Sequence, residues 1–182
     1  MRINFVTGNE GKFESFSNIV PEDVELERTP MDYPEDHDSN STEDIAREGA
    51  RYCHDELGEP VVVTDAGLFI DSLDGFPGVN TGFALDTIGR EGLLKLMENT
   101  ENRSAVFRLS LAYRDSDTAR VFTSETPGSI PESVRGEKGF GFDPVFVPEG
   151  HEETFGERPE LRDTEGPLHP AIHEFMEWFR SR

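Results

Sequence analysis

Apolar and polar positions alternate along the 182-residue chain in a pattern that predicts strands and helices following one another. Short β-branched or aromatic runs predict strands over residues 2–7, 24–26, 60–64, 105–113, 119–126 and 143–146. Apolar residues at helical spacing predict helices over 12–20, 42–54, 87–97 and 171–180, with Thr42 as the N-cap of the second. The alternation favours one α/β domain over residues 1–182, with a mixed twisted sheet and flanking helices.

The strongest strand signal is the continuous apolar run Pro60-Val61-Val62-Val63-Thr64, which is typical of a central strand buried on both faces. Asp65-Ala66-Gly67 follows at once, so we expect Asp65 at the carboxyl end of that strand, where α/β folds usually bind ligands. A carboxylate there can hold Mg²⁺ or orient a water. An aspartate that caps backbone groups in a turn fits the local pattern equally well.

The segment Thr7-Gly8-Asn9-Glu10-Gly11-Lys12 lies between a predicted strand and a predicted helix. Backbone N–H groups at such a helix start can hold an anion, and Lys12 adds a positive charge. The spacing is not that of a P-loop, and an ordinary turn with a surface lysine explains the segment as well.

Two further segments carry candidate chemistry. In Gly139-Phe140-Gly141-Phe142-Asp143 the aromatic rings could stack on a planar base while Asp143 reads its edge, although phenylalanines are more often core residues. The acidic loop over residues 34–44 includes Glu35, and one or two of its carboxylates could help to bind Mg²⁺.

The net charge of the chain excludes some classes of binding partner. The chain has 38 acidic and 17 basic residues, a formal net charge of −21, which is the wrong sign for binding nucleic acid or an anionic membrane. Only three of the basic residues are lysines, and this acid excess with few lysines suggests a protein adapted to high salt, although an ordinary acidic protein is the alternative. The lone Cys53, the lack of a signal peptide and the lack of a long apolar run favour a cytoplasmic location.

Taken in order, these segments resemble the Ham1-like inosine/xanthosine triphosphate pyrophosphatases over roughly residues 2–157. Thr7-x-Asn9-x-x-Lys12 is similar to the family's opening T-x-N-x-x-K signature, and Thr64-Asp65-Ala66-Gly67-Leu68 to its D-D-S-G-L segment. The other matching segments are Tyr33-Pro34-Glu35, Gly75-Phe76-Pro77-Gly78, Thr87 to Gly92, Arg135-Gly136, Gly139 to Phe146 and Thr154-Phe155-Gly156-Glu157.

The resemblance implies a cleft between a larger and a smaller lobe, in which a purine nucleoside triphosphate is cleaved to its monophosphate and pyrophosphate. It implies that Asp65 and Lys12 are catalytic, that Glu35 and Asp65 hold Mg²⁺, and that the protein is a homodimer. The substrate-binding residues that it implies are Thr7, Gly8, Asn9, Lys12, Ala66, Phe140, Phe142, Asp143 and His169.

The chain departs from the family pattern near its end. Leu168-His169-Pro170 stands where the family has Ser-His-Arg, and no lysine follows Lys138. Upstream, Glu48 stands at a common lysine position and Thr64 replaces the first acid of the D-D pair. These losses remove cations from a site for a triphosphate, and Arg158 or Arg162 could compensate.

Two rival functions follow from these departures. The first is a nucleotide-binding protein that has lost catalysis and acts as a sensor or a partner subunit. The second is a pyrophosphatase for another modified nucleotide.

Overall fold

The computed structural model describes residues 2–34 and 39–182. In this part of the chain seven strands form one mixed sheet in the order β2-β1-β3-β5-β6-β7, with β4 paired to β3. The strands are β1 (Arg2–Val6), β2 (Glu25–Thr29), β3 (Val61–Ile70), β4 (Pro77–Gly78), β5 (Ser104–Arg114), β6 (Ala119–Ser129) and β7 (Val147–Pro148). The helices are α1 (Glu10–Ile19), α2 (Thr42–Leu57), α3 (Thr81–Thr87), α4 (Gly89–Leu96), α5 (Glu160–Glu165) and α6 (Leu168–Arg180). This is the mixed α/β fold that the sequence predicts.

The chain forms two compact units. The first unit contains the described residues up to 65 together with 109–124 and 168–182, and the second contains 66–108 and 125–167. β3, β5 and β6 each contribute residues to both units. A single domain over the whole chain stays a prediction.

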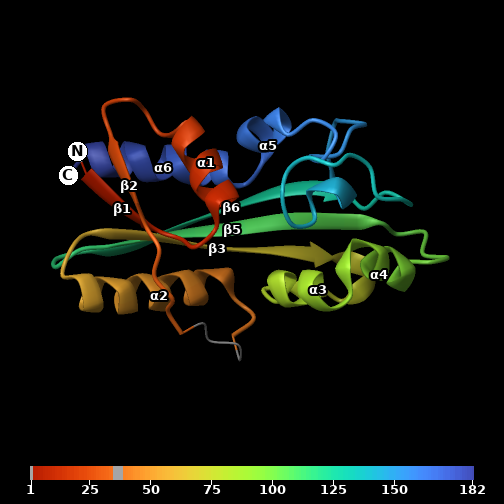
Figure 1. The fold of residues 1–182 in the computed structure, drawn as a ribbon, viewed down its shortest axis with the longest axis horizontal. Helices are drawn as coiled ribbons and strands as arrows, with labels where there is room; N and C mark the ends of the chain where they lie inside the picture. The colour runs from red at the N-terminus through yellow and green to blue at the C-terminus, as the bar shows by residue number, and fades with distance from the viewer. Residues whose placement is uncertain (1, 35–38) are drawn as a thin grey trace. The chain divides into compact units, whose positions relative to one another are not determined.

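The first unit places helices on both faces of its part of the sheet, with α2 on one side and α1 and α6 on the other (Figure 1). β1 pairs in parallel with both β2 and β3. Val61 and Val63 pack with Ala46, Ala50 and Cys53 of α2 in one core cluster. Val62 also has no exposed surface, so the prediction of a strand buried on both faces is confirmed.

The second unit is built around an aromatic core. The rings of Phe107 and Phe146 lie 4.6 Å apart between centroids, and those of Phe146 and Phe155 lie 5.4 Å apart. Leu93 and Met97, from α4 and its C-cap, complete the same cluster. This core supports the turn over residues 139–143, which carries the candidate base-binding residues.

β3 is longer than the sequence indicates. It continues to Ile70, so Asp65 lies in the middle of a strand and not directly after one. The reason is non-local: Leu68 pairs with Gly78 and Phe69 with Pro77 of the short antiparallel β4. A Cβ on Gly67 would meet the carbonyl oxygen of Gly78 at 2.5 Å, so this close approach requires glycine.

Three local predictions were also wrong. The helix expected over 87–97 begins later, at Gly89, which has a positive φ of 68°, and the preceding helix α3 was not predicted. Residues Asp143–Val145 form a 3₁₀ turn and not a strand, with the Val145 N–H donating to the Phe142 carbonyl at 2.9 Å. The N-cap of α2 is Ser41, whose hydroxyl accepts from the Asp44 N–H, while Thr42 is buried against Ser110.

Candidate functional site

The loop between β1 and α1 is held by its own side chains. Asn9 is the N-cap of α1, and its Oδ1 accepts from the Lys12 N–H at 3.0 Å. The Asn9 N–H donates to Thr7 Oγ1 at 3.1 Å. Two of the backbone N–H groups expected to hold an anion are therefore engaged within the loop. Gly8, Asn9 and Glu10 are exposed, so the start of this helix is open to solvent.

Arg28 braces the same loop, a role that sequence reasoning missed. It pairs in register with Phe5 across the parallel β1–β2 ladder. Its guanidinium donates to the carbonyl oxygen of Gly8 at 2.9 Å and to the Glu10 carboxylate at 3.2 Å. This role of Arg28 follows only from the strand register, because no sequence motif distinguishes an arginine in a short polar strand.

Strand register brings Asp65 to the same edge as this loop. Val6 pairs with Val63 in the parallel ladder between β1 and β3, so Thr7 lies just beyond the paired residues of β1, and Thr64 and Asp65 lie just beyond those of β3. Parallel strands run in one direction, so both segments lie toward the same end of the ladder. Asp65 is partly buried, and its Oδ2 atom has almost no exposed surface. The first unit therefore gathers the Thr7–Lys12 loop and Asp65.

Glu35, the second expected metal ligand, lies outside the described residues. Among the residues that are described, no cluster contains three or more histidine, cysteine, aspartate or glutamate side chains able to hold a metal. Within the described residues, a metal at Asp65 would therefore not find a complete set of protein ligands. This suits Mg²⁺, which commonly binds one or two carboxylates and substrate phosphates and keeps several waters.

The turn over residues 139–143 in the second unit is organised by Asp143. This aspartate is 1% exposed, and its Oδ2 accepts from the Phe140 N–H at 2.8 Å. Arg90 fixes the middle of the turn by donating to the Gly141 carbonyl at 2.7 Å. Gly139 has a φ of 76°, and a side chain there would collide with the Asp143 carboxylate. The carboxylate is therefore committed to shaping the turn.

Arg162 of α5 neutralises this buried carboxylate. It forms an ion pair with Asp143, and its guanidinium carbon lies 4.1 Å from the centroid of the Phe140 ring. Burial raises the pKa of the Asp143 carboxyl, while the Arg162 cation, the Phe140 N–H and the more distant Arg90 act in the opposite direction. Arg162 thus supplies a cation beside Phe140 in a segment where the family's usual lysine is missing.

The two phenylalanines of the turn lie in different surroundings. Phe142 is 1% exposed and belongs to the hydrophobic core of the second unit, so its ring is not available to stack on a base. This corrects its expected role in substrate binding, since the ring packs in the interior. Phe140 is partly exposed. It remains the candidate stacking ring.

The remaining two expected residues are Ala66 and His169. Ala66 follows Asp65 on β3 and is partly buried. His169 is the second residue of α6 and is also partly buried, with its Nε2 atom 3.2 Å from that of His173. Ala66 begins the second unit, whereas His169 belongs to the first.

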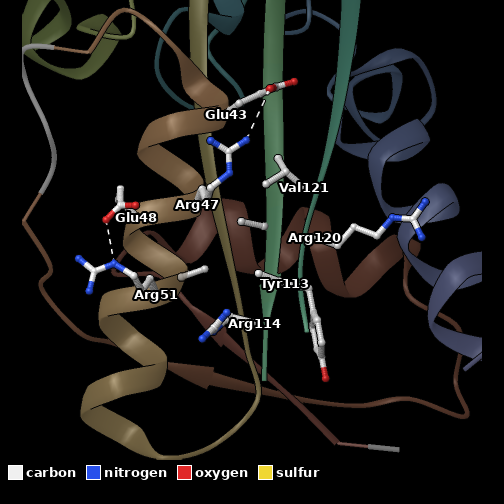
Figure 2. A pocket seen from close by; sticks show the side chains of 11 residues that line it. Glu43, Arg47, Glu48, Arg51, Tyr113, Arg114, Arg120 and Val121 are labelled. Atoms are coloured by element: carbon white, nitrogen blue, oxygen red, sulfur yellow. Dashed lines mark hydrogen bonds and ion pairs between the residues drawn. The ribbon is translucent and has the colours of Figure 1, made fainter. Parts of the chain in front are cut away.

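A cavity of about 430 Å³ lies elsewhere in the first unit, and Figure 2 shows Arg114 directed into it between α2 and the sheet. The lining arginines Arg47 and Arg51 already pair with acidic neighbours, at 2.6 Å with Asp44 and at 2.9 Å with Glu48. Its lining includes none of the residues predicted for the nucleotide. The cavity is therefore distinct from the candidate site.

The segments described here define a mixed α/β protein in which the Thr7–Lys12 loop and the Asp65 carboxylate lie toward one end of the parallel ladder between β1 and β3. The chain belongs to the Ham1 family, whose sequence profile matches residues 3–166. It is 45% identical to a dITP/XTP pyrophosphatase of Methanopyrus kandleri over 184 aligned residues, which cover 100% of this chain and 97% of the relative. It is 37% identical to the protein of the same description from Thermococcus kodakarensis, over 99% of this chain and 98% of the relative.

Solved structures agree with the fold. The Ham1 protein of Staphylococcus aureus superposes with a TM-score of 0.85 at 24% identity, covering 100% of this chain and 99% of that one. A structure from Mycobacterium abscessus, described as a nucleoside-triphosphatase or dITP/XTP pyrophosphatase, gives a TM-score of 0.75 at 28% identity, with 97% and 98% coverage. None of the helices in the described residues has the length and apolar character needed to cross a membrane.

Proposed function

We propose that this protein hydrolyses non-standard purine nucleoside triphosphates, such as dITP, ITP and XTP, to the monophosphate and pyrophosphate. The observation that carries the proposal is the 45% identity, along the whole chain, to a relative described as a dITP/XTP pyrophosphatase. The strand register supports it independently, because it gathers the Thr7–Lys12 loop and Asp65 toward one end of the parallel β1–β3 ladder.

In this proposal the first unit holds the triphosphate. Lys12 and the exposed start of α1 bind phosphate oxygens, with Thr7, Gly8 and Asn9 shaping the loop. Arg28 keeps the loop in place and adds positive charge to an otherwise acidic protein. Each charge-assisted hydrogen bond to phosphate contributes about 1.5–3 kcal/mol.

Asp65 and Glu35 would hold the divalent metal, which we propose to be Mg²⁺. Hard carboxylate oxygens fit this ion, and a bound Mg²⁺ would neutralise charge that develops on the phosphates during cleavage. Asp65 accepts a hydrogen bond from the attacking water and directs it at the α-phosphorus, so that pyrophosphate leaves.

The second unit would bind the base, and the Phe140 ring would stack on it. Ala66, the first residue of that unit, would also contact the substrate. Asp143 does not read the base edge in this proposal, because Arg162 and the Phe140 N–H occupy its oxygens. Its role is to fix the turn. His169 of the first unit contacts the substrate as a further polar group.

We further propose a cytoplasmic homodimer that works at high salt. The net charge of −21 and the use of fourteen arginines against three lysines support the salt adaptation, because counter-ions screen repulsion between acidic groups. The same charge argues against nucleic acid as a partner. The dimer rests on the family resemblance.

Pyrophosphate release from dITP, XTP and ATP in the presence of Mg²⁺ tests the activity. We expect turnover of dITP and XTP and little of ATP. Asp65→Asn should lower kcat by at least 100-fold with the fold intact, because the amide keeps the volume and loses the charge. Asp86→Asn, at an exposed position on α3, is the matched control and should behave as wild type.

Two outcomes would contradict the proposal. Saturable nucleotide binding without turnover at any salt concentration would favour a nucleotide-binding protein that has lost catalysis. The missing Ser-His-Arg motif is the reason for considering that alternative. Turnover of a different modified nucleotide, with dITP and XTP left intact, would favour the alternative pyrophosphatase.

A further inference from the structure

Two histidines one helical turn apart bring their Nε2 atoms together on α6. The Nε2 atoms of His169 and His173 are 3.2 Å apart, and the two rings lie 4.4 Å apart between centroids at an angle of 60°. His173 is exposed and His169 is partly buried, so solutes can reach the pair. The spacing of four residues puts both side chains on one face of the helix.

The separation fits a shared metal ion. An imidazole nitrogen binds Zn²⁺ at about 2.0–2.1 Å, and two such nitrogens 3.2 Å apart subtend about 103° at the metal. The tetrahedral angle is about 109°, so the pair is close to the geometry that a four-coordinate ion requires. Helical zinc motifs use two histidines at the same four-residue spacing.

The ligand type decides which metal would bind. Neutral imidazole suits Zn²⁺, Cu²⁺ and Ni²⁺, whereas Mg²⁺ and Ca²⁺ prefer oxygen ligands. Among the described residues, no group of three or more histidine, cysteine or carboxylate side chains includes the pair, so the two imidazoles are the protein ligands on which the proposal depends. With two imidazole ligands, affinity should follow the general order for divalent metals, with Cu²⁺ binding more tightly than Ni²⁺ or Zn²⁺.

We propose that His169 and His173 form a bidentate site for a divalent transition metal such as Zn²⁺, separate from the carboxylate site for Mg²⁺. A metal held there takes the Nε2 atom of His169 away from the nucleotide and thereby inhibits hydrolysis. The inhibitory consequence rests on the proposed function, whereas the binding itself does not.

Direct binding is measured by titrating ZnCl₂ into the full-length, untagged protein, with calorimetry as the readout and Co²⁺ absorption as a check on tetrahedral geometry. We expect one site whose affinity weakens at least tenfold in His173→Gln. His151→Gln, in the second unit, is the matched control and should keep the wild-type affinity. Zinc binding that is undetectable, or that is equal in wild type and His173→Gln, would overturn the proposal.

Inhibition is measured in the pyrophosphate-release assay at saturating Mg²⁺. Zn²⁺ should inhibit the wild type, and His173→Gln should keep its activity without zinc while tolerating at least tenfold more of it. Inhibition that is the same in both proteins would refute the inhibitory role. A failure of the proposed function would be seen separately, as no turnover in zinc-free buffer with the calorimetric site intact.

Discussion

Arg162 shows how one side chain can take on two tasks. Its guanidinium neutralises the Asp143 carboxylate, which is 1% exposed. The same guanidinium lies over the ring of Phe140, so the shape of the turn over residues 139–143 depends on Arg162. Removing one partner of a buried ion pair leaves the other charge without compensation, which is far more costly than the net value of the pair.

Arg162→Gln should therefore destabilise the protein by about 3–5 kcal/mol, because Asp143 would remain buried without its cation. Arg162→Lys keeps the charge but loses the planar guanidinium, so we expect a smaller loss. Urea unfolding measures both. The double variant Arg162→Gln/Asp143→Asn should recover part of the loss, and strictly additive effects would show that the two side chains are not coupled.

Single residues also show where sequence reasoning reaches its limit. Lys12 and Asp65 could be proposed as site residues because each lies beside a recognisable strand, and their roles stay predictions. Arg28 was not proposed, since its contact with the loop depends on strand register, and Arg162 was named only as a replacement cation, because its ion pair with Asp143 depends on a contact between α5 and the turn over residues 139–143. Phe142 was wrongly expected to bind the substrate, because the sequence of a turn with two phenylalanines does not show which ring packs in the core.

At the scale of elements, the turn over residues 139–143 depends on two glycines with different surroundings. Both adopt positive φ, 76° at Gly139 and 60° at Gly141. A Cβ at Gly139 would collide with the Asp143 carboxylate, whereas a Cβ at Gly141 would meet nothing within 4 Å. Alanine substitutions at these two glycines therefore distinguish two causes of lost stability. One is the unfavourable left-handed backbone conformation, and the other is steric collision of the new side chain.

Gly141→Ala should cost about 1–2 kcal/mol of stability, which is the penalty of a left-handed conformation for a residue with a side chain. Gly139→Ala should cost about 1–3 kcal/mol more, because the methyl group displaces Asp143 from the Phe140 N–H. Thermal unfolding and the KM for dITP are the measurements. Equal losses of stability in the two variants would mean that the turn can accommodate a methyl group at residue 139 without displacing Asp143.

The sheet illustrates why some elements could be predicted and others could not. The apolar run Val61 to Val63 identifies a buried strand from local pattern alone. The extension of β3 to Ile70 could not be predicted, because Asp65-Ala66-Gly67 reads locally as a turn and becomes strand through pairing with β4. The helix α4 could be predicted from the helical spacing of its apolar residues, whereas the short helix α3 was not predicted.

At the scale of the whole molecule, the last residue of the chain is tied to the sheet. Arg182 donates to the Asp115 carboxylate at 2.6 Å, and its guanidinium lies over the rings of Tyr113 and Trp178. Burial on its own would raise the pKa of Asp115, but hydrogen bonds from Arg182, Tyr113 and the N–H groups of Asp117 and Thr118 together lower it to about 2.

This cluster predicts part of the acid sensitivity of the fold. Because the folded pKa of Asp115 is below the unfolded value of about 3.9, its contribution is present above pH 4 and is lost as the pH falls toward 2. The shift sets an upper limit of about 2–3 kcal/mol, and solvent screening reduces the expected contribution to about 1 kcal/mol. Urea unfolding of wild type and Asp115→Asn should differ by this amount at pH 6 and converge near pH 2. A constant difference over that range would exclude Asp115 as its source.

The anchored end of the chain also bears on how the protein should be produced. Arg182 contacts three aromatic rings and a carboxylate, so a purification tag fused behind it would extend from a packed position. A polyhistidine tag at either end would add competing imidazoles to any zinc titration. A cleavable fusion at the amino terminus, removed before measurement, leaves both the anchor and the histidine pair undisturbed.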